Sequence, residues 1–229
     1  MSNPWYETLG VFDLETTGID VETSRIVSAT IAVLGAAGDV LERVDWLVNP
    51  GVEIPTAATN VHGITTEHAA QNGRVAAEGV AEIVSTLRAH LGRGLPIVAY
   101  NAPYDLTLLN RESHRYGIPP LISPSPVIDP LVIDKAVDRY RKGKRTLEVT
   151  SAFYQVVLDE AHDAGADAIA AGRVAQAIAR KHASVLPNTA EELHALQVTW
   201  CRQQAESFQE YMRRERDPQF LAAGGWPER

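Results

Sequence analysis

Apolar residues in the first fifty positions fall into three runs, at residues 9–14, 26–34 and 40–48. The second run alternates partly between apolar and polar positions, and the segment GAAGD that separates it from the third contains turn residues. This pattern predicts three consecutive strands joined by short loops, which is the arrangement of an antiparallel meander.

Beyond residue 50 the apolar spacing becomes mainly helical. Helices are predicted near residues 56–65, over 74–91, from 106 to 116, from 130 to about 140, within 146–157 and in the alanine-rich stretch that Pro187 ends. Short strands are predicted at 97–100 and 127–128. A last helix starts after Thr189, whose spacing to Glu192 is that of a capping box.

Strands and helices in this order predict an α/β protein with a mixed five-stranded sheet, a three-strand antiparallel meander extended by parallel strands and flanked by helices. A dinucleotide-binding fold would need G-x-G-x-x-G after the first strand, and the sequence lacks it there. We expect a domain over residues 1–187 and a C-terminal helical extension over residues 188–229.

The chain has 229 residues and a net charge of −8, which argues against a broad basic face for duplex nucleic acid. A cluster of carboxylates that binds divalent cations would fit this charge. Five Lys and Arg residues gather locally in the segment DRYRKGKR at 138–145. No apolar run approaches the ~18 residues of a membrane span, and Cys201 is the single cysteine, so we expect a cytoplasmic protein with no membrane partner.

The segment GVFDLETTG sets Asp13 and Glu15 at the end of the first predicted strand. The same spacing of two acidic residues recurs at 20–22 and 215–217, so the placement decides which pair carries chemistry. Asp105 follows the turn after the strand at 97–100, and Asp167 begins a later helix. Because ligand sites in open sheets form beyond the strand ends, we expect these four carboxylates to meet.

Such a carboxylate cluster would repel itself unless cations neutralised it. Oxygen-rich sites suit Mg²⁺ or Mn²⁺, and two such ions are the usual apparatus for attack on a phosphodiester. His162 stands in a loop five residues before Asp167, and a neutral histidine there can take a proton from water.

Three motifs now resemble those of a known family. FDLETTG, NAPYDLTLL and HDAGADA are similar to the motifs of the DEDDh, or DnaQ-like, 3′-to-5′ exonucleases, which include the proofreading subunit of bacterial replicative polymerases. The segments ending in HGIT and starting at RKGKR are also similar to family segments. Departures are small: Tyr100 replaces a frequent histidine and Tyr104 a frequent phenylalanine.

The resemblance implies an RNase H-like fold and a site with two divalent ions. It implies that Asp13, Glu15, Asp105 and Asp167 bind the metals and that His162 is the general base. The residues that it implies for substrate binding are Leu14, Thr16, Thr17, His62, Ile64, Asn101 and Tyr104.

The function expected from these residues is hydrolysis of single-stranded DNA from the 3′ end to nucleoside 5′-monophosphates, in proofreading or repair. One alternative keeps the mechanism and acts on short or structured RNA, because the metal-site motifs address a phosphodiester that both polymers share. A second alternative is a polymerase-associated docking module that uses its C-terminal helix. A polymerase or another replication protein is therefore an expected partner.

Overall fold

The computed structural model describes residues 4–157 and 164–229, which form a six-stranded sheet and eight helices. The strands are β1 (Leu9–Thr16), β2 (Ile26–Leu34), β3 (Val40–Asn49), β4 (Arg74–Val75), β5 (Ile97–Val98) and β6 (Val127–Ile128). The helices are α1 (Thr56–His62), α2 (Thr66–Asn72), α3 (Ala76–Gly92), α4 (Ala102–Arg115), α5 (Pro130–Val137), α6 (Leu147–Phe153), α7 (Ala164–Lys181) and α8 (Ala190–Glu215).

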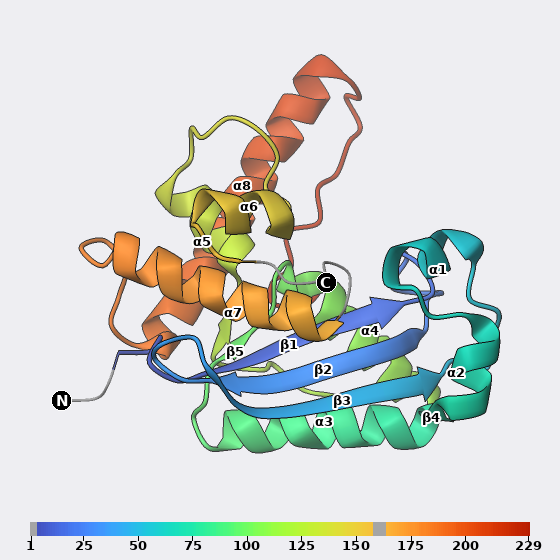
Figure 1. The fold of residues 1–229 in the computed structure, drawn as a ribbon. Helices are drawn as coiled ribbons and strands as arrows, with labels where there is room; N and C mark the ends of the chain where they lie inside the picture. Colours follow the sequence, from blue (N-terminus) through green and yellow to red (C-terminus); the bar gives the residue numbers. More distant parts are fainter. Residues whose placement is uncertain (1–3, 158–163) are drawn as a thin grey trace.

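The strands lie in the order β4-β3-β2-β1-β5-β6. β1, β2 and β3 pair antiparallel, whereas β5 pairs parallel to β1 and β6 pairs parallel to β5. Helix α3 lies along one face of this sheet and α7 along the other (Figure 1). The predicted α/β architecture, an antiparallel meander extended by parallel strands, is confirmed.

Side chains of β1 alternate between the two faces of the sheet, so its apolar residues enter two separate core clusters. Phe12 and Leu14 pack with α3 and α4, whereas Leu9 and Val11 pack with α7. Because side chains of a strand alternate between faces, the α7 face continues from Val11 to Asp13 and Glu15. The same periodicity that builds the core therefore aims both carboxylates at the side of the sheet that α7 covers.

The sheet has one strand more than the sequence predicted. Residues 74 and 75 were expected to begin a helix, but they pair parallel with Val48 and Asn49, and α3 starts only at Ala76. A Cβ on Gly73 would lie 2.6 Å from the backbone nitrogen of Asn49 and 2.4 Å from the carbonyl oxygen of Ala69. Only glycine lets the chain pass this close, and no periodic signal marks that contact.

Helix α8 packs along β6 and α5, with Leu193 and Gln197 fully buried. After α8 the chain folds back, and the backbone nitrogen of Arg229 donates to Oγ1 of Thr107 in α4 at 2.9 Å. The boundary between residues 187 and 188 stays a prediction. In the described part of the chain, no helix is both long enough and apolar enough to cross a membrane.

Helix α7 sits close to the sheet because it has glycine at position 172. A Cβ there would lie 2.5 Å from Cγ1 of Val11 and 2.6 Å from Cδ1 of Leu34. Gly172→Ala must displace α7, and overpacking of this kind lowers the free energy of unfolding by roughly 1–3 kcal/mol. Since α7 carries Asp167, we also expect weaker binding of divalent cations, which titration calorimetry measures.

Gly92→Ala is the matched control, because a Cβ on Gly92 in α3 has no heavy atom within 4 Å. We expect this control to keep the wild-type stability and cation affinity. Equal effects of the two substitutions in denaturant unfolding would contradict the close packing of α7.

Candidate active site

Three acidic side chains from two elements converge at the end of β1. Asp13 and Glu15 lie on the same face of the strand, and Asp167 lies in the first turn of α7. Each residue offers a carboxylate oxygen, and these oxygens all lie within 4.8 Å of one another. The structure thus brings together three of the four carboxylates that the sequence singled out.

Asp105, the fourth carboxylate, lies beside this group in the first turn of α4, with 3% of its surface exposed. Burial raises the pKa of Asp105 well above its usual range, and the charges of Asp129 and Glu15 raise it further. Hydrogen bonds from the backbone of Asp105 and of Leu14 act in the opposite direction. The contact with Leu14 places Asp105 against the strand segment that carries Asp13 and Glu15.

Asp129 holds the start of α4 in place. Its Oδ1 accepts the backbone N–H of Asn101 at 3.0 Å, and its Oδ2 accepts that of Ala102 at 3.1 Å. Asn101 is left-handed, with φ 63° and ψ 45°, a conformation that asparagine adopts more readily than most residues. Asn101 therefore shapes the turn that orients Asp105.

Asp129 is in turn fixed by α8. The side-chain oxygen of Gln197 accepts the backbone N–H of Asp129 at 2.6 Å, and its amide nitrogen donates to the carbonyl of Val127 at 3.0 Å. Neither Asp129 nor Gln197 was predicted from the sequence as a support of the site. An aspartate followed by proline is typical of a helix start, so the sequence contained a signal for Asp129 as a helix cap. No sequence pattern links Asp129 to Gln197.

Tyr104 and Thr16 close the turn that follows β1. The hydroxyl of Tyr104 donates to the carbonyl of Gly18 at 2.5 Å and lies 2.6 Å from Oγ1 of Thr16. Oγ1 of Thr16 also donates to the carbonyl of Gly18, at 2.8 Å. Burial raises the pKa of Tyr104 to about 12, so this hydroxyl keeps its proton near neutral pH. Tyr104 thus binds the turn at the mouth of the site.

Thr17 turns toward the start of β2 rather than toward the carboxylates. Its backbone nitrogen donates to the carbonyl of Arg25, and its Oγ1 accepts the backbone N–H of Arg25, both at 3.0 Å. These two bonds fix the backbone of the turn that begins at Thr16.

His62 ends α1, and its Nδ1 accepts the backbone N–H of Ile64 at 3.1 Å. Its Nε2 is buried and makes no hydrogen bond within the described residues. Burial lowers the pKa of His62, against the opposing effect of the backbone of Thr16 and of His62 itself. A neutral His62 with a buried ring nitrogen therefore lies near the turn after β1, while Ile64 packs against the small cluster of Val27, Ile54 and Ala69.

His162 lies outside the described residues. Tyr100 replaces a frequent histidine of the family pattern. Its hydroxyl donates to the carbonyl of Arg145 at 2.7 Å and contacts Oγ1 of Thr150 in α6.

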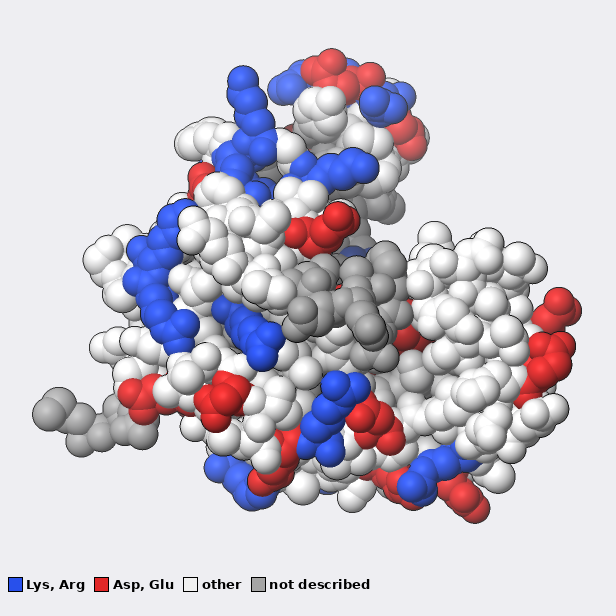
Figure 2. Space-filling view, viewed as in Figure 1, with Lys and Arg blue, Asp and Glu red and all other residues white. Residues whose placement is uncertain are grey.

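The basic segment at 138–145 divides into partly buried and exposed members. Arg141 and Arg145 pair with the fully buried Asp134, which also accepts the hydroxyl of Tyr154 at 2.8 Å. The remaining cations of the segment are exposed. On the face in Figure 2, Lys and Arg side chains also gather over the C-terminal half of α7, which includes Lys181.

The donor set fits hard divalent cations. Three carboxylates that supply only oxygen atoms, in a partly buried position, suit Mg²⁺ or Mn²⁺ better than the softer metals that prefer nitrogen or sulfur. A cation among them would also offset the repulsion between their charges.

The chain is similar to known proteins both in sequence and in fold. A family model for RNase_T, described as Exonuclease, matches residues 11–175. DNA polymerase III PolC-type from Streptococcus sanguinis (strain SK36) is 30% identical over 168 residues, which cover 73% of this chain. Those residues cover 11% of the PolC-type protein, so the chain spans about a tenth of that relative's length.

Two solved structures share the fold at low sequence identity. Exonuclease I of E. coli in complex with a dA16 oligonucleotide gives a TM-score of 0.66 at 20% identity, over 78% of this chain and 42% of that chain. Exonuclease X in complex with 5′ overhanging duplex DNA gives a TM-score of 0.58 at 17% identity, over 81% of this chain and 99% of that chain.

The raised pKa of Asp105 predicts a pH-dependent effect of Asp105→Asn on the protein in EDTA. An unfolded aspartate titrates near ~3.9, so above that pH the folded protein binds more protons than the unfolded chain, and stability falls as pH rises. Asparagine does not titrate, so Asp105→Asn removes this loss of stability at high pH. We expect Asp105→Asn to raise the melting temperature at pH 8 by a few degrees.

The comparison at about pH 4 is the internal control, because the carboxyl of Asp105 is then protonated in the folded protein and only about half ionised in the unfolded chain, so little of the loss remains. We expect the difference in melting temperature to shrink toward zero there. A difference that stays constant from pH 4 to pH 8 would contradict the raised pKa.

Proposed function

Because this chain belongs to the RNase_T exonuclease family, we propose that it hydrolyses single-stranded DNA from the 3′ end and releases nucleoside 5′-monophosphates. The match confirms the family predicted from the three motifs, the DnaQ-like 3′-to-5′ exonucleases, and with it the prediction of an exonuclease enzyme. The RNase H-like fold predicted with that family is also confirmed by the likeness to Exonuclease I.

The convergence of Asp13, Glu15 and Asp167 carries this proposal. We propose that these three residues, with Asp105 beside them, hold two Mg²⁺ or Mn²⁺ ions. Bound ions of this kind supply a hydroxide nucleophile and stabilise the leaving oxygen of a phosphodiester.

The chain's own residues position the strand and move the proton. We assign His162 as the general base that takes the proton of the attacking water, as its place five residues before Asp167 suggests. The backbone at Leu14, Thr16 and Thr17 would face the terminal nucleotide, which fits the hydrogen bonds that fix the turn after β1. His62 and Ile64 would border the same nucleotide.

Asn101 and Tyr104 act on the substrate through the backbone they hold. Asn101 supplies the left-handed residue before α4, and Tyr104 bonds to the carbonyl of Gly18. Removing either contact would loosen a wall of the site without removing a metal ligand. Their proposed role is therefore positioning.

The choice of DNA rests on the fold relatives. Exonuclease I was solved with a dA16 oligonucleotide, and Exonuclease X with a 5′ overhanging duplex. The PolC-type relative is a DNA polymerase III, which supports a polymerase or another replication protein as partner, in proofreading or repair. The single cysteine, Cys201, fits the cytoplasmic location that we propose.

Two alternatives to this function predict different results in a digestion assay. An exoribonuclease would keep the carboxylates and prefer RNA, and a docking module would hydrolyse neither polymer. The presence of all four carboxylates favours hydrolysis over docking alone.

Asp167→Asn and Asp13→Asn should each lower the rate of digestion of a 5′-labelled single-stranded DNA oligomer at least about a thousandfold in Mg²⁺. Each removes a charge from the cation site, where metal assistance supplies several kcal/mol of transition-state stabilisation. EDTA should stop the wild-type enzyme, and added Mg²⁺ should restore it. The label on the 5′ end distinguishes a 3′-to-5′ ladder from attack at the other end.

Asp217→Asn is the control, because Asp217 has the same spacing to an acidic neighbour but lies beyond the end of α8. This variant should retain the wild-type rate. Full activity of Asp13→Asn or Asp167→Asn would refute the proposal, and faster digestion of a matched RNA oligomer would favour the exoribonuclease.

A further inference from the structure

A groove of about 650 Å³ lies between α5 and α8, outside the carboxylate site. Lys135 and Arg139 line it on the α5 side. On the α8 side its lining residues include Trp200, Phe208 and Tyr211. Together with Gln203, Gln204 and Ser207, these positions of α8 recur every three to four residues, so they form one face of the helix.

The charge of this groove is opposite to that of the protein. The chain has a net charge of −8, yet the lining contains two cations and no carboxylate. Glu206 and Glu210 of α8 do not line the groove. An anionic occupant is therefore favoured here, although the protein as a whole carries a negative charge.

Aromatic rings beside these cations are open to solvent. Phe208 is 51% exposed, Tyr211 47% and Tyr140 88%. The guanidinium carbon of Arg139 lies 5.9 Å from the centre of the Tyr140 ring. Exposed rings interspersed with Lys and Arg are the features that bind a single nucleic-acid strand, because bases stack on the rings while the cations contact phosphates.

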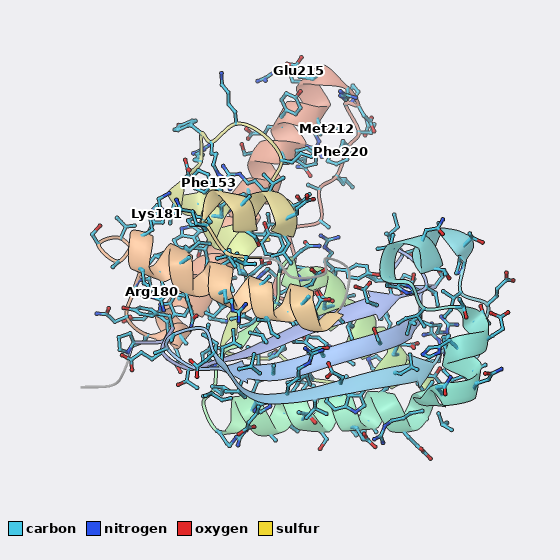
Figure 3. The ribbon with its side chains drawn as sticks, viewed as in Figure 1. Phe153, Arg180, Lys181, Met212, Glu215 and Phe220 are labelled. Atoms are coloured by element: carbon cyan, nitrogen blue, oxygen red, sulfur yellow. The ribbon has the colours of Figure 1, made fainter. Side chains whose placement is uncertain are left out.

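The far half of α8 is held in place by the segment that follows it. The ring of Phe220 packs edge-on against Phe208, with ring centres 5.4 Å apart, and Nε of Arg213 donates to the carbonyl of Phe220 at 2.8 Å. Figure 3 labels Met212 and Phe220 at the end of α8 that lies away from the sheet. The aromatic face is thus preformed, which lowers the entropic cost of binding.

Both walls of the groove, α5 and α8, are connected to the carboxylate site. Helix α5 begins directly after Asp129, which orients the turn before Asp105, and Lys135 lies six residues farther, about 9 Å along a helix. In α8, Trp200 lies one turn beyond Gln197, which bonds to Asp129. From Trp200 to Tyr211 the groove face extends for about 16 Å.

We propose that the α5–α8 groove binds the single strand several nucleotides upstream of the 3′ end that enters the carboxylate site. The inference rests on the proposed function, since the groove would retain the strand that the site shortens. Its occupant is the polymer backbone and its bases, so the groove acts on long strands and not on a terminal nucleotide alone.

The test uses the full chain and two double variants, Lys135→Ala/Arg139→Ala and Phe208→Ala/Tyr211→Ala. We expect each to raise the KM for dT20 about tenfold, as loss of base stacking or phosphate contacts predicts, and to leave the KM for dT4 unchanged. Hydrolysis of the p-nitrophenyl ester of thymidine 5′-monophosphate should also remain unchanged, because this substrate cannot reach the groove.

The dependence of KM on salt concentration distinguishes the phosphate contacts of the cations from base stacking on the aromatic rings. Loss of two phosphate contacts should reduce the slope of log KM against log salt by about 1.4 for Lys135→Ala/Arg139→Ala, and the aromatic variant should keep the wild-type slope. The control is Arg202→Ala/Arg216→Ala, which removes two exposed charges outside the groove and should behave as wild type.

Anisotropy of labelled dT20 and rU20 in EDTA measures binding without hydrolysis. If the wild-type enzyme digests neither polymer, the proposed function fails, while weaker binding by the groove variants would still support the groove. Unchanged affinity and KM in both double variants would overturn the inference and favour a protein occupant. An equal rise of KM for dT4 and dT20 would also overturn it, since the effect would then lie in the site.

Discussion

The close approach of α7 to β1 is the contact on which the site depends. Asp13 and Glu15 face α7 because they continue the alternation that buries Val11, and Asp167 reaches them from the first turn of that helix. Gly172 permits this approach, since a larger side chain would meet Val11 and Leu34. Close packing of apolar residues therefore brings together three carboxylates even though their charges repel one another.

A second set of contacts supports the site from the other side of β1. Gln197 of α8 holds Asp129, and Asp129 holds the two backbone N–H groups that begin α4. Asp105 follows in the first turn of α4. Helix α8 thus takes part in the geometry of the catalytic end of the sheet, whatever else binds along its far half.

Much of this arrangement could be predicted from the sequence, because it follows from local periodicity and motifs. The three-strand meander and the placement of Asp13, Glu15 and Asp167 are of this kind. The short strand β4 was not predictable, because two residues carry no period and the backbone contact at Gly73 involves a distant strand. The pairing of Asp129 with Gln197 joins residues 68 positions apart and leaves no periodic signal.

We propose above all that the end of β1 is the divalent-cation site of an exonuclease. Anomalous diffraction from crystals soaked in Mn²⁺ tests it most directly, because it locates the metal independently of activity. We expect a peak bonded to the carboxylates of Asp13, Glu15 and Asp167. Mn²⁺ peaks elsewhere on the protein, with none at these carboxylates, would contradict it.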